Sequence, residues 1–164
     1  MPARKKHQRT VSRNQEGGTA VEIRKMTRED CSQVCKVEEA CFSTPWSLKS
    51  FEDTFSYSGN HYLTVWEDAK IIGFIGLMAV GDEGDITNVA VLPDYRKRGA
   101  GDALVDAMLC LAEEKGIHKL MLEVRSSNIA AIHLYEKYGF QLLCKRKNYY
   151  QKPVEDADIM CWQK

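Results

Sequence analysis

Apolar residues recur along this chain with two periods, one typical of helices and one typical of strands. The clearest helical period begins at Ala100, where apolar residues return every three or four positions as far as Ala112. That spacing puts one apolar stripe on a helix, and Gly116 is the residue type that ends a helix in the left-handed conformation. Shorter alternating or continuous apolar runs predict strands. We expect seven strands, at residues 21–25, 61–66, 71–80, 85–92, 119–124, 141–146 and 158–162.

Capping residues and periodicity together predict four helices. Thr27 and Asp30 have the spacing of a capping box, so a first helix begins there, and Ser47 is a good cap for a short second helix. The striped helix is the third, and the fourth covers residues 128–138. The second, third and fourth strands form an antiparallel meander, and the helix after the fourth strand makes the fourth and fifth strands parallel. The expected fold class is α/β (α+β), built on one mixed sheet.

Length and charge limit the function classes. A chain of 164 residues fits one domain and is too short for a two-domain dinucleotide enzyme or a barrel of eight strand–helix units. Lys plus Arg equals Asp plus Glu at 23, which argues against a protein that coats nucleic acid. No apolar run approaches the roughly 20 residues of a membrane helix.

The basic residues are unevenly spread. Residues 1–19 carry five Lys or Arg against Glu16 alone, show little apolar periodicity and end near two glycines. This composition predicts a disordered basic tail or leader, with a faint similarity to an organelle transit peptide. Residues 20–164 are expected to form the folded domain.

The cysteines and histidines predict no metal site. Six cysteines occur without a CxxC pair and without the Cys/His spacing of a zinc site, and the histidines are scattered. Without a secretion signal, the cysteines are expected to be reduced thiols, which favours a cytoplasmic protein.

A basic, glycine-containing loop at residues 96–101 lies between a predicted strand and the striped helix. A helix start offers unpaired N–H groups and the positive end of the helix dipole, and glycine lets a ligand oxygen approach the backbone closely. These features predict a phosphate or pyrophosphate site, although a solvated basic loop with a glycine bend is the alternative. A P-loop is excluded because Asp102 and Ala103 stand where Lys and Ser or Thr are needed, and Leu104 breaks the dinucleotide fingerprint.

The same loop, after a strand that ends in Asn88-Val89-Ala90-Val91, resembles the acetyl-CoA signature of the GNAT acetyltransferases. Other segments resemble one branch, the bacterial ribosomal-protein alanine N-acetyltransferases of the RimI type, and the similarity spans about residues 21–162. These segments are residues 45–47, 122–128, 131–135, 138–140, 146–150 and 155–157. The resemblance implies the GNAT fold, a mixed, splayed seven-stranded sheet with two of four helices on each face. It also implies transfer of acetyl from acetyl-CoA to a protein N-terminus, most specifically the alanine of small-subunit ribosomal protein 18.

The resemblance further implies which residues hold acetyl-CoA. The strand at residues 89–91 would bind the pantetheine arm through its free backbone, and the loop would wrap the pyrophosphate. Asn128 would reach the pantetheine from the other wall, or cap a helix, or do both. The implied residues are Val89, Ala90, Val91, Arg96, Lys97, Arg98, Gly99, Ala100, Gly101, Asp102 and Asn128.

Glu123 is the candidate general base, because it interrupts an otherwise apolar strand. A buried carboxylate is costly unless it is paired, hydrated or protonated, and an ion pair with Arg125 is the structural alternative. As a base, it would take a proton from the incoming ammonium, through an ordered water. An α-amino group has a pKa of about 7.7–8.0 and a lysine about 10.4, so a modest base is enough for an N-terminus.

Tyr135 is the general acid that the resemblance implies, because a phenol can protonate a departing thiolate. Most inward tyrosines are simply part of the core. No cysteine is expected at the position of a nucleophile, so direct attack is predicted, with oxyanion stabilisation by a backbone N–H near Val91.

Two aromatic loops would flank the acceptor channel in the family. Their residues are Phe42 and Trp46 in one loop and Tyr149 and Tyr150 in the other. Glu155 and Asp156 would meet a basic second residue of the acceptor, or merely solvate a hairpin turn.

Two alternatives to this function stay open. One is an enzyme of the same fold acting on a small-molecule amine or a protein lysine. The other is a non-catalytic acyl-CoA-binding or ribosome-associated module. No membrane partner and no sequence-specific nucleic acid binding are expected, and a monomer or weak dimer is predicted.

Overall fold

The structure, a computed structural model, describes residues 9–11 and 20–164. All seven predicted strands are present in one mixed sheet, and an eighth, β1 (Arg9–Val11), pairs with β2. The rest of the predicted tail lies outside the described residues. The order across the sheet is β1-β2-β3-β4-β5-β6-β8-β7. The seven predicted strands are β2 (Val21–Lys25), β3 (Asn60–Glu67), β4 (Lys70–Val80), β5 (Glu83–Val91), β6 (Lys119–Arg125), β7 (Gln141–Gln151) and β8 (Val154–Gln163).

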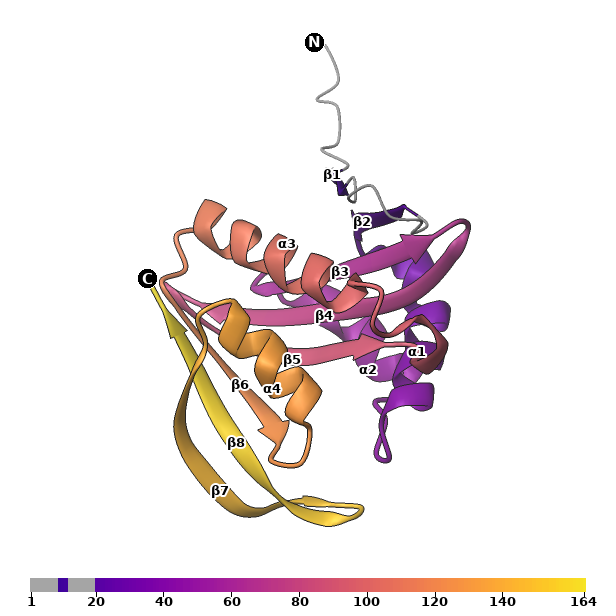
Figure 1. The fold of residues 1–164 in the computed structure, drawn as a ribbon. Helices are drawn as coiled ribbons and strands as arrows, with labels where there is room; N and C mark the ends of the chain where they lie inside the picture. The colour runs from indigo at the N-terminus through magenta and orange to yellow at the C-terminus, as the bar shows by residue number, and fades with distance from the viewer. Residues whose placement is uncertain (1–8, 12–19) are drawn as a thin grey trace.

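The four predicted helices are confirmed and cover both faces of the sheet, α1 and α2 on one face and α3 and α4 on the other (Figure 1). Side-chain caps mark where two of them, α2 and α4, begin: Ser47 Oγ accepts the Ser50 N–H at 3.2 Å, and Asn128 Oδ1 accepts the Ala131 N–H at 3.2 Å. The helices are α1 (Cys31–Cys41), α2 (Leu48–Asp53), α3 (Ala100–Glu114) and α4 (Ile129–Lys137), and the short 3-10 turns are η1 (Arg28–Asp30), η2 (Thr54–Ser56) and η3 (Pro93–Tyr95).

Each face of the sheet has its own apolar core. Val34 of α1 and Phe51 of α2 pack against Phe74 on one face. Leu104 and Met108, from the predicted stripe of α3, pack on the other face. All five side chains are at most 1% exposed, and complete burial of each such side chain contributes about 1.5–3 kcal/mol.

The β7–β8 hairpin is longer than the sequence predicts. Strand β7 extends to Gln151, so Tyr149 and Tyr150 belong to a strand and the prediction of a loop there was wrong. Nearly every residue of β7 is exposed, because the strand forms the edge of the sheet. An exposed edge strand lacks the apolar alternation by which strands are recognised in a sequence.

Strands β5 and β6 are parallel, as predicted, and they splay apart. They pair at three positions, from Glu83 opposite Lys119 to Asp85 opposite Met121. On its other side, β5 carries a bulge: Gly76 of β4 lies opposite Asn88 and Leu77 opposite Ile86, which leaves Thr87 without an opposing residue. A bulge bends its strand and changes which residues face each side of the sheet. The splay opens the sheet along the second half of β5.

The helices of the described residues include none that is long and apolar enough to cross a membrane.

Candidate active site

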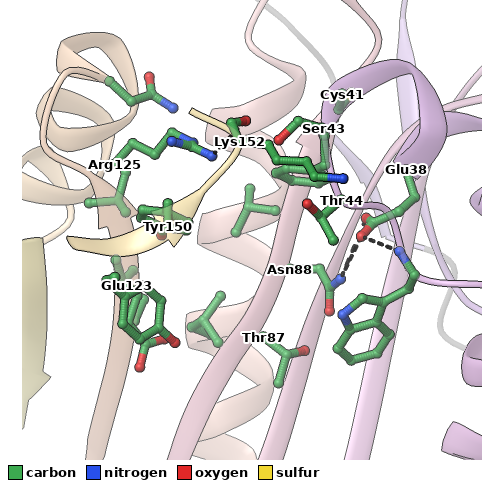
Figure 2. A pocket seen from close by; sticks show the side chains of 18 of the residues that line it. Glu38, Cys41, Ser43, Thr44, Thr87, Asn88, Glu123, Arg125, Tyr150 and Lys152 are labelled. Atoms are coloured by element: carbon green, nitrogen blue, oxygen red, sulfur yellow. Dashed lines mark hydrogen bonds between the residues drawn. The ribbon is translucent and has the colours of Figure 1, made fainter. Parts of the chain in front are cut away.

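A cavity of about 560 Å³ lies between the diverging halves of β5 and β6. Its walls come from these two strands, from the end of α1 and the loop after it, from the start of α4, and from β7. Figure 2 shows Glu123 and Tyr150 on one wall and Glu38 and Asn88 on the other. The cavity therefore brings together segments that are more than 100 residues apart in the sequence.

Glu123 lines this cavity, but the prediction that it is buried was wrong. Along β6, Leu122 and Val124 are buried in the core, and Glu123 between them is exposed on the opposite side of the strand. Arg125, the alternative ion-pair partner of Glu123, pairs with Glu155 instead: Arg125 Nη1 lies 3.3 Å from Glu155 Oε1. The Glu123 side chain therefore borders the cavity and is not enclosed by the core.

Tyr135 also lines the cavity, from the inward side of α4. Its side chain is 7% exposed, and burial raises the pKa of its phenol above the ordinary value. A raised pKa keeps the phenol protonated at neutral pH. Tyr135 is therefore a neutral phenol at the cavity wall.

The four aromatic residues predicted to flank an acceptor meet around the same cavity. Phe42 and Trp46 come from the segment after α1, and Tyr149 and Tyr150 come from β7. The two tyrosine rings pack edge to face with centroids 5.0 Å apart. Burial, with a smaller effect of Tyr149, raises the pKa of Tyr150 to about 12.

The two acidic residues expected to meet a basic acceptor residue do not line the cavity. Glu155 accepts the backbone N–H of Ser127 at 2.7 Å, and Asp156 accepts that of Asn148 at 2.9 Å. The Glu155 carboxylate thus joins the β7–β8 hairpin to the segment after β6, and the Asp156 carboxylate joins β8 to β7.

The basic loop at residues 96–101 leads into the first turn of α3. Gly99 precedes the helix with a φ of +81°, a left-handed conformation that glycine adopts without strain. The first N–H groups of α3 and the helix dipole are therefore available to an anion. Ala100 and Gly101 begin the helix, and the Asp102 carboxylate forms an ion pair with Lys137.

The arginine side chains of this loop bind to the protein itself. Arg96 Nε donates to the carbonyl of Val91 at 2.9 Å, and Arg98 Nη2 donates to the carbonyl of Asp94 at 3.1 Å. Lys97, between them, has its backbone in the left-handed conformation, with a φ of +61°. An anion here would be held through main-chain amides more than through the two guanidinium groups.

The backbone of β5 suits an extended ligand in the gap. Among the described residues, β5 beyond Asp85 has no partner strand on its β6 side. Val89 lines the cavity and is followed by Ala90 and Val91, and Asn128 lines it while capping α4. Unpaired strand amides and carbonyls can hydrogen-bond a pantetheine arm, so these residues fit the cosubstrate that the sequence predicts.

Sequence reasoning missed Glu38, a carboxylate 2% exposed in the cavity wall. It accepts the Trp46 N–H at 3.2 Å and lies 3.5 Å from Asn88 Nδ2. Burial raises its pKa. The available signal was its position four residues after Val34, on the buried face of α1.

Cys41 also lines the cavity. Its S–H contacts the carbonyl of Val91 at 3.4 Å, and burial raises the pKa of its thiol. A raised pKa lowers the thiolate fraction, so this geometry does not favour a covalent nucleophile.

Comparisons with known proteins agree with this geometry. Residues 31–140 match the acetyltransferase (GNAT) family. The chain is 37% identical over 142 residues to a ribosomal protein bS18-alanine N-acetyltransferase of Escherichia coli, covering 84% of this chain and 94% of that protein. The Haemophilus influenzae protein of the same name is 38% identical over 136 residues, with 80% and 90% coverage.

A solved structure gives the same result. The crystal structure of the ribosomal-protein-S18-alanine N-acetyltransferase from Escherichia coli superposes with a TM-score of 0.81 and 34% identity, covering 87% of this chain and 93% of that chain. The match over most of both chains confirms the fold and the family that the motifs predict. This chain therefore belongs to the GNAT family and is an acetyl-CoA-dependent N-acetyltransferase.

Proposed function

We propose that this protein acetylates the N-terminal α-amino group of a protein, namely the N-terminal alanine of ribosomal protein bS18. The observation that carries the proposal is one cavity that contains a carboxylate, a neutral phenol, an open strand edge and four aromatic side chains. The names of the relatives at 37–38% identity supply the acceptor. Such an enzyme would work in the cytoplasm, where ribosomal proteins are made.

The acetyl donor would lie along the second half of β5. The amides at the start of α3 would hold its pyrophosphate, and the free edge at residues 89–91 would hold the pantetheine arm and the thioester. In this position the thioester carbonyl points into the gap beside Glu123. The acceptor peptide would enter between the Trp46 segment and β7.

The chemistry would consist of one direct attack and three proton transfers. Glu123 takes a proton from the α-ammonium through a water, and the neutral nitrogen attacks the thioester carbonyl. A backbone N–H near Val91 stabilises the oxyanion of the tetrahedral intermediate. As the carbon–sulfur bond breaks, Tyr135 protonates the coenzyme A thiolate. The second proton of the nitrogen passes through water to the resulting tyrosinate, so the neutral amide leaves, and Glu123 releases its proton to solvent.

Acceptor competition tests the acceptor. A peptide with the bS18 N-terminal sequence is expected to be acetylated faster than spermidine, an aminoglycoside or the same peptide with a blocked α-amine. Faster turnover of the small amines would instead indicate a small-molecule acetyltransferase. Coenzyme A binding without transfer to any amine would indicate an acyl-CoA-binding module.

Replacement of Glu123 tests the base. Glu123→Gln is expected to lower kcat with the bS18 peptide by about 10²–10⁴-fold at pH 7, because the ammonium then lacks its proton acceptor. Glu114→Gln, which removes an exposed carboxylate from the end of α3, is the matched control and should retain full rate. Full activity of Glu123→Gln would show that another group is the base.

A further inference from the structure

Glu38 joins three segments of the cavity wall through its buried carboxylate (Figure 2). It belongs to the last turns of α1 and is 2% exposed. Its Oε1 accepts the backbone N–H of Trp46 at 3.2 Å, in the loop after the helix. Both of its oxygens lie 3.5 Å from Nδ2 of Asn88 on β5. One side chain therefore connects α1, the acceptor-side loop and the splayed strand.

The connection continues to the bulge of β5. The Tyr62 O–H donates to Asn88 Oδ1 at 3.3 Å and shares a hydrogen bond with Thr87 Oγ1 at 3.1 Å. Thr87 is the bulged residue, and it lies just beyond the last paired residues of β5 and β6. The network thus runs from the Trp46 loop, through Glu38 and Asn88, to the point where the cavity begins.

A buried polar network of this kind specifies one arrangement of the segments that it joins. If Glu38 lost one of these hydrogen-bond donors, fewer hydrogen bonds would offset the cost of burying its carboxylate. Movement of the Trp46 loop away from β5 is therefore disfavoured. Burial and these donors act oppositely on the pKa of Glu38, and burial has the larger effect. Glu38 exposes almost no surface of its own to a ligand.

We propose that Glu38 is a positioning residue for the acceptor: through Trp46 and Asn88 it sets the width of the cavity mouth opposite Glu123. The inference rests on the proposed function, since it assigns the Trp46 side of the cavity to the acceptor. Because Glu38 acts through other residues and does not touch the thioester, its loss should impair acceptor binding more than the chemical step. The binding of coenzyme A should be unaffected.

The test is steady-state kinetics of Glu38→Leu, which keeps a similar side-chain volume and removes both hydrogen-bonding oxygens. The KM for the bS18 peptide is expected to rise about tenfold, while kcat and the KM for acetyl-CoA stay within about twofold of wild type. Glu38→Gln keeps an oxygen for the Trp46 N–H, so its KM should stay within about threefold of wild type.

Gln33→Ala is the matched control, because it separates positioning from general stability. Gln33 is on the same helix and accepts a backbone N–H of β4, that of Ile71, at 3.3 Å, but it does not line the cavity. Its loss should lower the melting temperature while the KM values remain those of wild type. Glu38→Leu should differ from this control in the acceptor KM.

Three outcomes would overturn the inference. An unchanged acceptor KM in Glu38→Leu, with or without a lower melting temperature, would make Glu38 merely structural. A loss confined to kcat would place Glu38 in the chemical step. An equal KM rise in Gln33→Ala would mean that any loosening of α1 has this effect. If wild-type protein acetylated no α-amine at all, the proposed function itself would fail.

Discussion

Glu38 and Glu123 are both carboxylates on the wall of one cavity, but they differ in how far their side chains are buried. Glu123 is exposed on the cavity side of β6, and Glu38 is enclosed between α1 and β5. The apolar run around Glu123 makes it the candidate base, but the orientation of its side chain depends on the splay of β5. In the sequence, Glu38 looks like an ordinary helix residue. No local pattern pairs it with Trp46, 8 residues further on, or with Asn88, 50 residues further on.

Burial of Glu38 predicts a specific pH dependence of stability. The pKa of Glu38 is raised in the folded protein above 4.5, its ordinary value. The folded state therefore binds more protons than the unfolded state just above this pH, and the stabilisation present below pH 4.5 is lost as the pH rises through the raised pKa.

Glu38→Gln carries no titrating proton at this site, so it should not suffer this loss. The free energy of unfolding of wild type is expected to fall relative to that of Glu38→Gln as the pH rises from 4.5. Urea denaturation at several pH values between 4.5 and 8 measures the difference, with Glu39→Gln as the reference for removal of an exposed carboxylate from the same helix. A difference that does not change with pH would contradict the prediction.

At the scale of elements, α3 is the clearest case in which local sequence decides structure. Its apolar stripe and its flanking glycines set both ends, and the helix runs from Ala100 to Glu114 as a result. Gly99 and Gly116 both adopt a positive φ, of +81° and +70°. They share a backbone requirement, but only Gly99 lies at the predicted pyrophosphate site.

Substitution of each glycine by alanine separates the two roles. Gly99→Ala and Gly116→Ala should each cost about 1–2 kcal/mol of stability, because a side chain disfavours the left-handed conformation. An alanine at Gly116 meets no atom within 4 Å, so that variant isolates the backbone cost. Calorimetric titration with coenzyme A should show weaker binding for Gly99→Ala and wild-type affinity for Gly116→Ala. Equal affinities in the two variants would remove the pyrophosphate from this loop.

The β5 bulge and the extension of β7 from Arg146 to Gln151 were beyond prediction at this scale. A bulge depends on how β5 pairs with β4, and its position at Thr87 has no local signature. Strand β7 lies at the edge of the sheet and buries almost nothing, so its sequence carries no alternation. Both features nevertheless build walls of the cavity.

At the scale of the whole molecule, the sheet is held together on both faces and opened in the middle. The two apolar cores lie under α1 and α2 and under α3 and α4, and β5 and β6 separate between them. A ligand in the gap would contact both halves of the sheet. Ligand binding should therefore stabilise the entire fold.

Coenzyme A should raise the melting temperature by mass action. At a free concentration of 100 times Kd, binding to the folded state alone adds about 2.7 kcal/mol, which corresponds to a rise of about 5–10 °C for a protein of this size. Differential scanning fluorimetry measures this shift. Pantetheine lacks the pyrophosphate and should give a clearly smaller shift at the same concentration. Equal shifts would argue that the start of α3 contributes nothing to binding.

The sequence by itself determined the order of helices and strands, the glycine-marked start of α3, and the family. These follow from periodicity, capping and short motifs, which act over a few neighbouring residues. Only the tertiary structure decided that Glu123 is exposed to a cavity, that Tyr150 reaches its wall as part of a strand, and that Glu38 is buried behind it. The physical reason is that this cavity arises where two distant strands stop pairing, and pairing over such distances leaves no periodic mark in the chain.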